Sequence, residues 1–219
     1  MQKTPIRSVP FSNEELESGR HLFSKDCDFI TGCATLDQIP DISITEVAFG
    51  GRSNVGKSSL INALVNQKAL ARISNTPGRT REINFFNLSE QMVLTDLPGY
   101  GYARAPKLQI KKWTNLVNTY LKGRANLRRT FVLIDSRHGL KPNDYNMLKM
   151  LDKAAQSYQL ILTKCDKINP TALISILEKT QQILNHHPAA YPKIIWTSSK
   201  TGEGLPELRA ALVKLAPID

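Results

Sequence analysis

The sequence predicts an α/β fold, in which a mostly parallel sheet carries helices on both faces. From about residue 44 onward, short apolar runs alternate with stretches of helical periodicity, as expected for such a fold. Proline stands near the start of three helical stretches, where its fixed φ suits the first turn, at Pro142, Pro170 and Pro206. The chain has 219 residues, of which 41% are hydrophobic and 22% charged, so one such domain with a buried core is expected.

Each expected element follows from its own pattern. Six apolar runs are expected to be strands, in chain order residues 44–49, 82–88, 92–95, 130–135, 158–163 and 193–197. Alternation in the second run and a turn before the third predict an antiparallel hairpin at the sheet edge. Further periodicity predicts helices over residues 58–66, 171–185 and 205–215.

The chain is expected to divide after residue 42. Residues 1–42 are predicted to be an N-terminal extension with one short helix, and residues 43–219 the main domain. The helix is expected to begin near Ser12 or Asn13, because either residue can cap a helix that has acidic residues in its first turn.

Residues 51–58 match G-x-x-x-x-G-K-[ST], the pattern of a loop that holds phosphates. Its glycines permit a tight turn, after which successive backbone N–H groups converge on the phosphates at the start of a helix. Lys57 is expected to reach the β and γ phosphates, and the Ser58 hydroxyl to bind Mg²⁺. A strand before and a helix after argue against a glycine-rich loop without function. The predicted nucleotide contacts here are Gly51, Arg52, Ser53, Asn54, Val55, Gly56, Lys57 and Ser58.

Two further segments are expected to lie near the γ phosphate. Asp96-Leu97-Pro98-Gly99 ends an apolar strand, so that Asp96 can hold Mg²⁺ through a water and the Gly99 N–H can meet the γ phosphate. In the stretch 75–82, Thr76 and Thr80 compete for the role of second Mg²⁺ ligand. The Pro-Gly pair between them favours Thr80, and γ phosphate and Mg²⁺ can order such a loop.

Two motifs near the C-terminus predict the base. In Thr163-Lys164-Cys165-Asp166, the Asp166 carboxylate can accept hydrogen bonds from N1–H and the 2-amino group of guanine, which adenine does not offer. Lys164 is expected to lay its stem along the base. The backbone of Thr197-Ser198-Ser199-Lys200 is expected to meet the guanine O6. The predicted ligand is therefore GTP or GDP rather than an adenine nucleotide.

Longer runs around these motifs resemble one protein family. Residues 47–64, 76–80 (Thr-Pro-Gly-Arg-Thr) and 96–103 (Asp-Leu-Pro-Gly-Tyr-Gly-Tyr-Ala) resemble the EngB family of bacterial GTPases, also called YihA or YsxC. The resemblance covers nearly the whole chain. It implies a Ras-like P-loop GTPase domain (G domain) over residues 43–219, with a six-stranded sheet that has one antiparallel edge strand. It also implies a switch in large ribosomal subunit assembly that is needed, indirectly, for normal cell division and septation.

Carried over by position, the resemblance places nucleotide contacts on residues 51–58, 78–82, 96–99, 163–166 and 197–200, and Mg²⁺ ligands on Ser58 and Thr80. The contacts that it adds to those above are Gly78, Arg79, Thr80, Arg81 and Glu82, together with Leu97 and Pro98, Thr163 and Cys165, and Thr197.

Hydrolysis is expected to be slow. Phosphoryl transfer is mainly positioning and charge neutralisation, which makes Lys57, Thr80 and Gly99 the candidate catalytic residues. Ras-like switches have a glutamine after D-x-x-G, whereas Tyr100 stands there in this chain and is not an obvious substitute. A partner is therefore expected to raise the rate. Asn54 resembles the asparagine of potassium-activated GTPases, which makes K⁺ a possible cofactor, and the alternative is that Asn54 only braces the loop.

Charge predicts a further partner. The net charge of +10 exceeds what a nucleotide requires, so RNA or a ribonucleoprotein is expected to bind. The family resemblance implies that this partner is the large ribosomal subunit precursor and its rRNA. Tyr100 and Tyr102 could stack on RNA bases, but packing against the core is favoured. No apolar run reaches the roughly 18–20 residues of a membrane span, so no membrane partner is expected. Three cysteines, an odd and sparse set, favour a reducing compartment, and the protein is expected to be cytoplasmic. A monomer is the default expectation.

Two other classes of function remain open. The chain could be a binding module that holds GTP or GDP with negligible hydrolysis, because the glutamine is absent. It could also be a GTPase of another RNA-related process or of membrane transport, although such proteins normally carry extra domains for which 219 residues leave no room.

Overall fold

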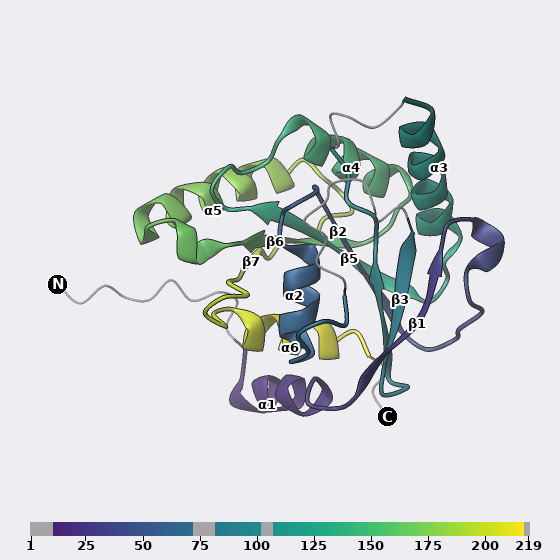
Figure 1. Cartoon of the computed structure of the whole chain (residues 1–219). Coiled ribbons are helices and arrows are strands. Elements are labelled where there is room, and N and C mark those ends of the chain that lie inside the picture. Colours follow the sequence, from purple (N-terminus) through teal and green to yellow (C-terminus); the bar gives the residue numbers. More distant parts are fainter. Residues whose placement is uncertain (1–10, 72–81, 102–106, 217–219) are drawn as a thin grey trace.

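The computed structural model describes residues 11–71, 82–101 and 107–216, with the backbone alone over 107–110. Within them, seven strands form one sheet in the order β1-β3-β4-β2-β5-β6-β7 (Figure 1). The strands are β1 (Cys27–Cys33), β2 (Glu46–Gly51), β3 (Ile83–Leu88), β4 (Met92–Asp96), β5 (Leu127–Asp135), β6 (Tyr158–Thr163) and β7 (Ile195–Trp196). The predicted fold class, a mostly parallel sheet in an α/β domain, is confirmed.

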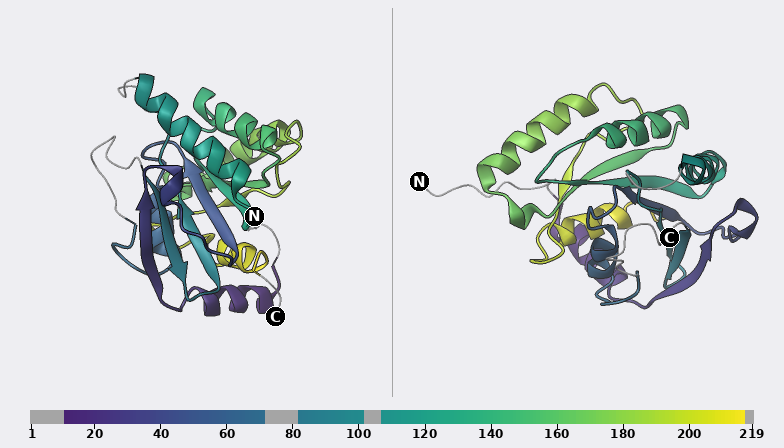
Figure 2. Two further views of the ribbon diagram at one scale, coloured as in Figure 1. Left: turned by 90° about the vertical axis from the view of Figure 1, so that its right-hand side faces the viewer. Right: turned by 45° about the horizontal axis from the view of Figure 1, so that its top comes forward.

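Helices cover both faces of this sheet (Figure 2). One face carries α1 (Asn13–Leu22), α2 (Lys57–Leu64) and α6 (Leu205–Val213), and the other carries α3 (Lys107–Gly123), α4 (Pro142–Lys153) and α5 (Pro170–Leu184). Alternation along the strands divides the core, because Val47 and Phe49 of β2 pack toward α2 whereas Ala48 packs toward the opposite layer. Two short 3₁₀ helices, η1 (Leu36–Gln38) and η2 (Cys165–Lys167), complete the described elements.

The sheet has one more strand than predicted, and it comes from the N-terminal region. β1 pairs antiparallel with β3, which in turn pairs antiparallel with β4. Among the described strands β3 alone therefore runs against the others, and it is second from the edge because β1 covers it. The sequence does not reveal β1, since Phe29 and Ile30 are exposed and the register shifts between Phe29 and Thr31. A half-buried strand without alternation gives no period-two signal.

The N-terminal helix is capped and packed on α6. Ser12 caps α1 and exchanges hydrogen bonds with Glu15, which confirms the predicted helix start. A Cβ on Gly19 would lie 2.7 Å from the backbone nitrogen of Ala210, so glycine allows the two helices to approach closely. The predicted boundary after residue 42 stays a prediction, and both α1 and β1 pack against the domain that follows it.

The predicted element bounds differ from the observed ones by a few residues. The strand expected over 44–49 spans Glu46–Gly51, and the one expected over 193–197 shortens to Ile195–Trp196. The hairpin of β3 and β4 is present, and its Asn84 to Leu88 pair with Asp96 to Met92. Since β2, β4, β5, β6 and β7 are parallel, their carboxyl ends share one edge of the sheet. In α/β sheets ligands bind at this edge.

Candidate nucleotide site

The loop that joins β2 to α2 is shaped by its backbone. Asn54 and Gly56 adopt positive φ values of 63° and 103°, and Gly56 is the N-cap of α2. A Cβ on Gly51 would lie 2.8 Å from a Val55 methyl group, so the loop is tightly wrapped. The first amides of a helix lack partners within the helix, and Gly56 has no side chain to cap them. The loop thus offers N–H groups and the positive end of a helix dipole to an anion.

Lys57 links this loop to the end of β4. Its ammonium group contacts the carboxylate of Asp96, and the two side chains are only 10% and 5% exposed. Burial raises the pKa of Asp96 above its ordinary value, and the charge of Lys57 opposes that rise. Ser58 follows Lys57 in α2 and is partly exposed. A hydroxyl and a carboxylate therefore lie at the edge of the sheet where β2 and β4 end.

The chain after β4 runs directly beside the phosphate loop. The backbone N–H of Tyr100 donates to the Gly51 carbonyl at 3.2 Å, and the Ser53 N–H donates to the Tyr100 carbonyl at 3.0 Å. A Cβ on Gly99 would lie 3.2 Å from the Cα of Ser53, so the two backbones are in contact. Leu97 completes the link, because its N–H donates to the Phe49 carbonyl at 2.9 Å.

The side chain of Tyr100 turns into the core. It is 6% exposed, its hydroxyl donates to Asp144 of α4 at 2.9 Å, and its ring centre lies 6.4 Å from that of Trp113. Burial, with the charge of Asp144 as a second cause, raises the pKa of Tyr100 well above its ordinary value. The hydroxyl is therefore a neutral donor near pH 7. Of the two roles considered for Tyr100, packing is the one that the geometry favours, and Tyr102 lies outside the described residues.

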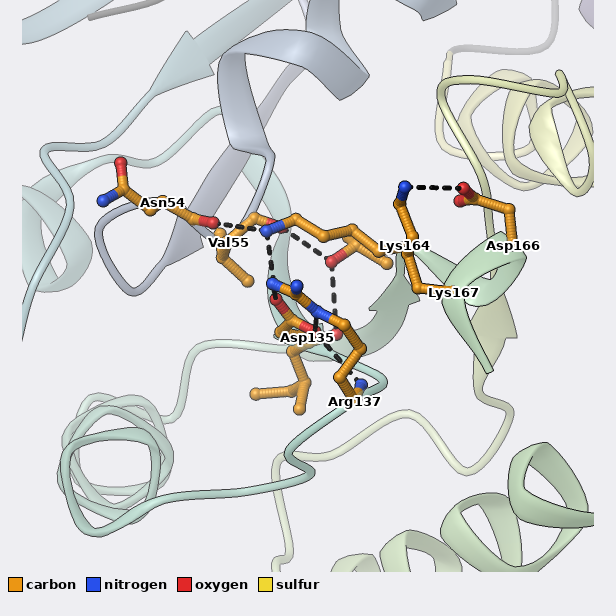
Figure 3. A network of polar contacts seen from close by, with 9 residues as sticks. Asn54, Val55, Asp135, Arg137, Lys164, Asp166 and Lys167 are labelled. Atoms are coloured by element: carbon orange, nitrogen blue, oxygen red, sulfur yellow. Dashed lines mark hydrogen bonds and ion pairs between the residues drawn. The ribbon is translucent and has the colours of Figure 1, made fainter. Parts of the chain in front are cut away.

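Lys164 joins the first guanine motif to the phosphate loop (Figure 3). It follows β6 with a φ of 58°, and its Nζ donates to the Asn54 carbonyl at 2.6 Å and to Asp135 Oδ2 at 3.0 Å. The Thr163 hydroxyl donates to the Val55 carbonyl at 2.7 Å. Two consecutive residues of the motif therefore hold two consecutive carbonyls of the loop.

Asp135 is the centre of this network, and the sequence did not single it out. It ends β5, and its carboxylate accepts hydrogen bonds from Nε and Nη2 of Arg137 at 2.9 and 2.7 Å, as well as from Lys164. Burial alone would raise the pKa of Asp135, but the hydrogen bonds from Arg137 and Lys164 outweigh it and hold the pKa well below the ordinary range. The carboxylate stays ionised and fixes the ammonium of Lys164.

Figure 3 also shows how Asn54 is oriented. Its main-chain carbonyl faces Lys164, whereas its side-chain amide points away from the network, and the residue is exposed. The phosphate loop therefore contacts the guanine motif through the main chain of Asn54, and the side-chain amide of Asn54 faces solvent.

Asp166 is positioned by the second guanine motif. Its Oδ1 accepts a hydrogen bond from the Ser198 hydroxyl at 2.7 Å, and the Lys200 N–H donates to the same hydroxyl at 3.3 Å. The backbones are also joined, since the N–H of Cys165 donates to the Thr197 carbonyl at 3.1 Å. Cys165, at the free position of the motif, is buried. The side chain of Asp166 is 13% exposed, so it is not fully buried.

Four of the five predicted segments thus meet at one edge of the sheet: residues 51–58, 96–99, 163–166 and 197–200. The fifth lies mostly outside the described residues, including Thr76, Gly78, Arg79, Thr80 and Arg81. Glu82, its last member, is exposed and precedes β3. Their contacts with a nucleotide stay predictions.

Comparison with known proteins identifies the family. The family model for 50S ribosome-binding GTPases matches residues 46–164, more than half of the chain. The probable GTP-binding protein EngB of Rhodospirillum rubrum is 50% identical over 226 residues, which cover 99% of this chain and 98% of that protein. That of Rhizobium etli is 54% identical and covers 92% of this chain and 97% of its own. The chain belongs to the EngB family of GTP-binding proteins. The EngB resemblance found in the sequence is thereby confirmed.

Solved structures confirm the Ras-like GTPase fold for this EngB-family chain. The crystal structure of a probable GTP-binding protein EngB superposes with a TM-score of 0.64 at 22% identity, and covers 78% of this chain and 98% of that one. The structure of Era with MgGDPNP and part of 16S ribosomal RNA also gives 0.64, at 24% identity, over 81% of this chain and 58% of that one. Both likenesses concern the fold alone. No helix among the described residues of this chain is long and apolar enough to cross a membrane.

Proposed function

We propose that this chain is a slow GTPase that acts as a switch in assembly of the large ribosomal subunit. Membership of a GTP-binding family with a ribosome-binding description supports the general function. The observation that carries the nucleotide assignment is the pairing of Asp166 with Ser198 beside the Lys164 anchor. This geometry holds a carboxylate where guanine can donate to it from N1–H and the 2-amino group.

Each loop has a role in this proposal. The amides of residues 54–58 receive the phosphates, and Lys57 exchanges the carboxylate of Asp96 for the β and γ phosphates. Gly99 donates its N–H to the γ phosphate, and Thr80 approaches from the segment outside the described residues. The backbone of residues 197–200 meets the guanine O6. The other residues predicted to contact the nucleotide belong to these same loops.

The donor set at the phosphate end fits Mg²⁺. Magnesium prefers oxygen ligands, and both the Ser58 hydroxyl and the Asp96 carboxylate belong to this class. Asp96 is buried and already faces a cation, the ammonium of Lys57. We propose that Ser58 and Thr80 hold Mg²⁺ and that Asp96 holds it through a water. Bound there, the ion would neutralise charge on the phosphates.

The placement of Tyr100 supports the proposal of slow hydrolysis. Because its hydroxyl donates to Asp144 inside the core, it cannot take the place of the glutamine that positions water in Ras-like switches. We therefore propose a low intrinsic rate that a ribosomal partner raises. K⁺ is a second proposed activator, since the side-chain amide of Asn54 is exposed at the phosphate loop. Equal rates in K⁺ and Na⁺ would eliminate potassium, and many turnovers per minute by the isolated protein would contradict the low rate.

The proposed partner is the precursor of the large subunit and its rRNA, bound by a cytoplasmic monomer. A net charge of +10 on a protein that already neutralises a nucleotide supports a second polyanionic ligand. Any need for the protein in cell division and septation would then be indirect, because cells short of ribosomes divide badly.

Co-sedimentation with purified large ribosomal subunits tests the proposal. The protein is loaded with GDP or a non-hydrolysable GTP analogue and is sedimented at two salt concentrations, with Asp166→Ala as a control that cannot select guanine. We expect tighter association with the analogue, steep weakening by salt through released counterions, and loss of the nucleotide effect in the control. Association that ignores the nucleotide, or that is absent at physiological salt, would contradict the ribosomal role.

The main alternative is a binding module that holds GTP or GDP with negligible hydrolysis. The buried Tyr100 hydroxyl favours it as well. Measurement of GTP turnover with and without ribosomal subunits separates the two, because only the switch predicts a stimulated rate. Stimulation by another RNA, and not by subunits, would instead favour a GTPase of a different RNA-related process.

A further inference from the structure

A buried carboxylate lies directly behind the phosphate loop, outside all five nucleotide motifs. Asp144, in the first turn of α4, has a fully buried side chain. Its Oδ1 accepts the hydrogen bond from the Tyr100 hydroxyl at 2.9 Å, and its Oδ2 lies 3.1 Å from Nε of Arg52. The backbone N–H of Lys141 also donates to Oδ2, at 2.8 Å. One carboxylate therefore contacts the second residue of the phosphate loop and the residue that follows D-x-x-G.

The backbones of those two residues are already joined. Arg52 and Tyr100 form a parallel bridge, which consists of the hydrogen bonds from Tyr100 to Gly51 and from Ser53 to Tyr100. Gly99 lies between the end of β4 and this bridge, and a Cβ on it would lie 3.2 Å from the Cα of Ser53. A shift of the Gly99 backbone as a whole would therefore disturb the bridge that its neighbour Tyr100 makes.

The opposite end of β2 has a cluster of the same composition. Glu46, the first residue of β2, accepts hydrogen bonds from the Tyr120 hydroxyl and from Nε of Arg124, the latter at 2.7 Å. Both clusters combine a tyrosine, an arginine and a fully buried carboxylate. Within the described part of the chain, the hydrogen-bond partners of the Glu46 cluster include no residue predicted to bind nucleotide, whereas two of the three members of the Asp144 cluster adjoin or belong to such motifs. The Glu46 cluster is therefore a matched internal control.

We propose that Asp144 is a positioning residue that tunes the relative affinity of the site for GTP and GDP. It holds Tyr100 and Arg52 in register, and this fixes the Gly99 N–H where the γ phosphate arrives. A group that is already in place loses little conformational entropy on binding, so only the nucleotide with a γ phosphate benefits. The inference rests on the proposed function, in that Gly99 must meet the γ phosphate.

Stability alone does not account for a charged cluster at this position. Replacing a buried ion pair with well-packed apolar residues is often neutral or stabilising, so burial of Asp144 and Arg52 gives the fold no clear advantage. What the cluster adds is direction, since the Tyr100 hydroxyl and the Lys141 N–H each donate a hydrogen bond to the carboxylate, to which the Arg52 guanidinium adds an ion pair. Such directional contacts hold a backbone segment in one register.

The test compares Tyr100→Phe with Tyr120→Phe. Each substitution removes one hydroxyl from a buried tyrosine that donates to a carboxylate. Because Glu46 Oε1 also accepts from the Thr95 hydroxyl, the two variants are compared by the ratio of their nucleotide affinities and not by their folding stability. Dissociation constants are measured for GDP and for a non-hydrolysable GTP analogue. In Tyr100→Phe we expect the analogue to bind about fivefold more weakly or worse, at the lower end of typical coupling between sites, and GDP to change by less than about twofold. In Tyr120→Phe the ratio of the two constants should stay at the wild-type value.

Asp144→Asn provides the second measurement, and its double variant with Tyr100→Phe closes a cycle. We expect the effects of Tyr100→Phe and Asp144→Asn on the ratio of the two dissociation constants to be non-additive, because both substitutions break the same hydrogen bond. A ratio unchanged in Tyr100→Phe, or changed equally in Tyr120→Phe, would overturn the proposal even if Asp144→Asn does not fold. Failure of the proposed function is a separate result, since wild-type protein would then show no guanine nucleotide binding or no nucleotide-dependent association with ribosomal subunits.

Discussion

Replacement of Asp135 by asparagine tests how the guanine site is built. The substitution keeps the size of the side chain and removes the charge that holds both Lys164 and Arg137. The two cations differ in how much they depend on it, because the Arg137 side chain is 42% exposed and the Lys164 side chain 26%. Water can replace the lost partner of Arg137, so that contact contributes roughly 0–1 kcal/mol.

The contact with Lys164 accounts for most of the expected loss. A hydrogen bond to a charged group contributes about 1.5–3 kcal/mol, which corresponds to roughly a ten- to 150-fold change in a dissociation constant. In Asp135→Asn the ammonium keeps the Asn54 carbonyl and meets at most a neutral amide oxygen in place of the carboxylate, so the stem of Lys164 is held less firmly beside the base. We therefore expect Asp135→Asn to bind GDP about tenfold more weakly or worse. We also expect the free energy of unfolding of this variant to be lower than that of the wild type.

A titration with fluorescent GDP measures this effect, with Arg137→Gln as the matched control. The control removes the two guanidinium contacts and leaves the contact between Asp135 and Lys164, so its affinity should stay within about threefold of wild type. The reasoning is refuted if Asp135→Asn binds GDP within twofold of wild type, or if Arg137→Gln weakens binding as much as Asp135→Asn does.

The pKa of Asp135 sets how the difference in folding stability between wild type and Asp135→Asn depends on pH. Because that pKa is held below its ordinary value, the carboxylate stabilises the folded state above the unfolded-state pKa of about 3.9, and the stabilisation is lost as the pH falls below it. The difference in unfolding free energy between wild type and Asp135→Asn should thus be constant from pH 5 to 8 and decline only in more acidic solution. Urea denaturation at several pH values measures it.

Two further predictions concern a glycine and the buried thiols. Gly204→Ala should destabilise the fold strongly, because its φ is 75° and a Cβ would lie 1.9 Å from the Trp196 carbonyl oxygen, whereas Gly202→Ala, with φ 83° and open space, should lose only about 1–2 kcal/mol in urea denaturation. Burial raises the pKa of Cys27 to about 12 and of Cys165 to about 11, so the folded state favours the thiol, and stability declines as the pH rises above the unfolded value of about 8.5. Between neutral pH and pH 9.5 each thiol should account for about 1.4 kcal/mol of lost unfolding free energy, and Cys27→Ala should show a correspondingly smaller decline. Equal destabilisation by Gly204→Ala and Gly202→Ala would contradict the first prediction. An alkaline loss of stability in Cys27→Ala as large as that of the wild type would contradict the second.

The sequence predicts the fold class and the motif positions because both depend on local patterns. A phosphate loop needs its glycines and lysine at fixed spacing, and each later motif follows an apolar run that becomes a parallel strand. Parallel strands bring their carboxyl ends together, so chain order alone places the motifs at one edge. The strand β1 escapes prediction because Asp28, Phe29 and Ile30 show no alternation, and pairing with β3 defines it instead.

Residues that support the motifs are harder to predict, because their partners are distant in sequence. Asp144 lies 44 positions from Tyr100, and Asp135 lies 29 from Lys164. Neither carboxylate belongs to a pattern of fixed spacing, and Asp144 reads as an ordinary acid in the first turn of a helix. A signal exists only for Asp135, which ends a predicted strand at the edge where ligands bind.

The burial of Tyr100 connects the two proposals about this site. A residue that followed D-x-x-G and reached the water would need a free polar group on the nucleotide side, but the hydroxyl of Tyr100 is bound to Asp144 behind the loop. The same contact that removes Tyr100 from the chemistry fixes the neighbouring Gly99 amide. A switch needs a binding energy that differs between GTP and GDP more than it needs a fast reaction, because it transmits which nucleotide is bound. We therefore propose that the tyrosine serves discrimination between the nucleotides, and that the group that positions water is supplied by a partner or by a bound cation.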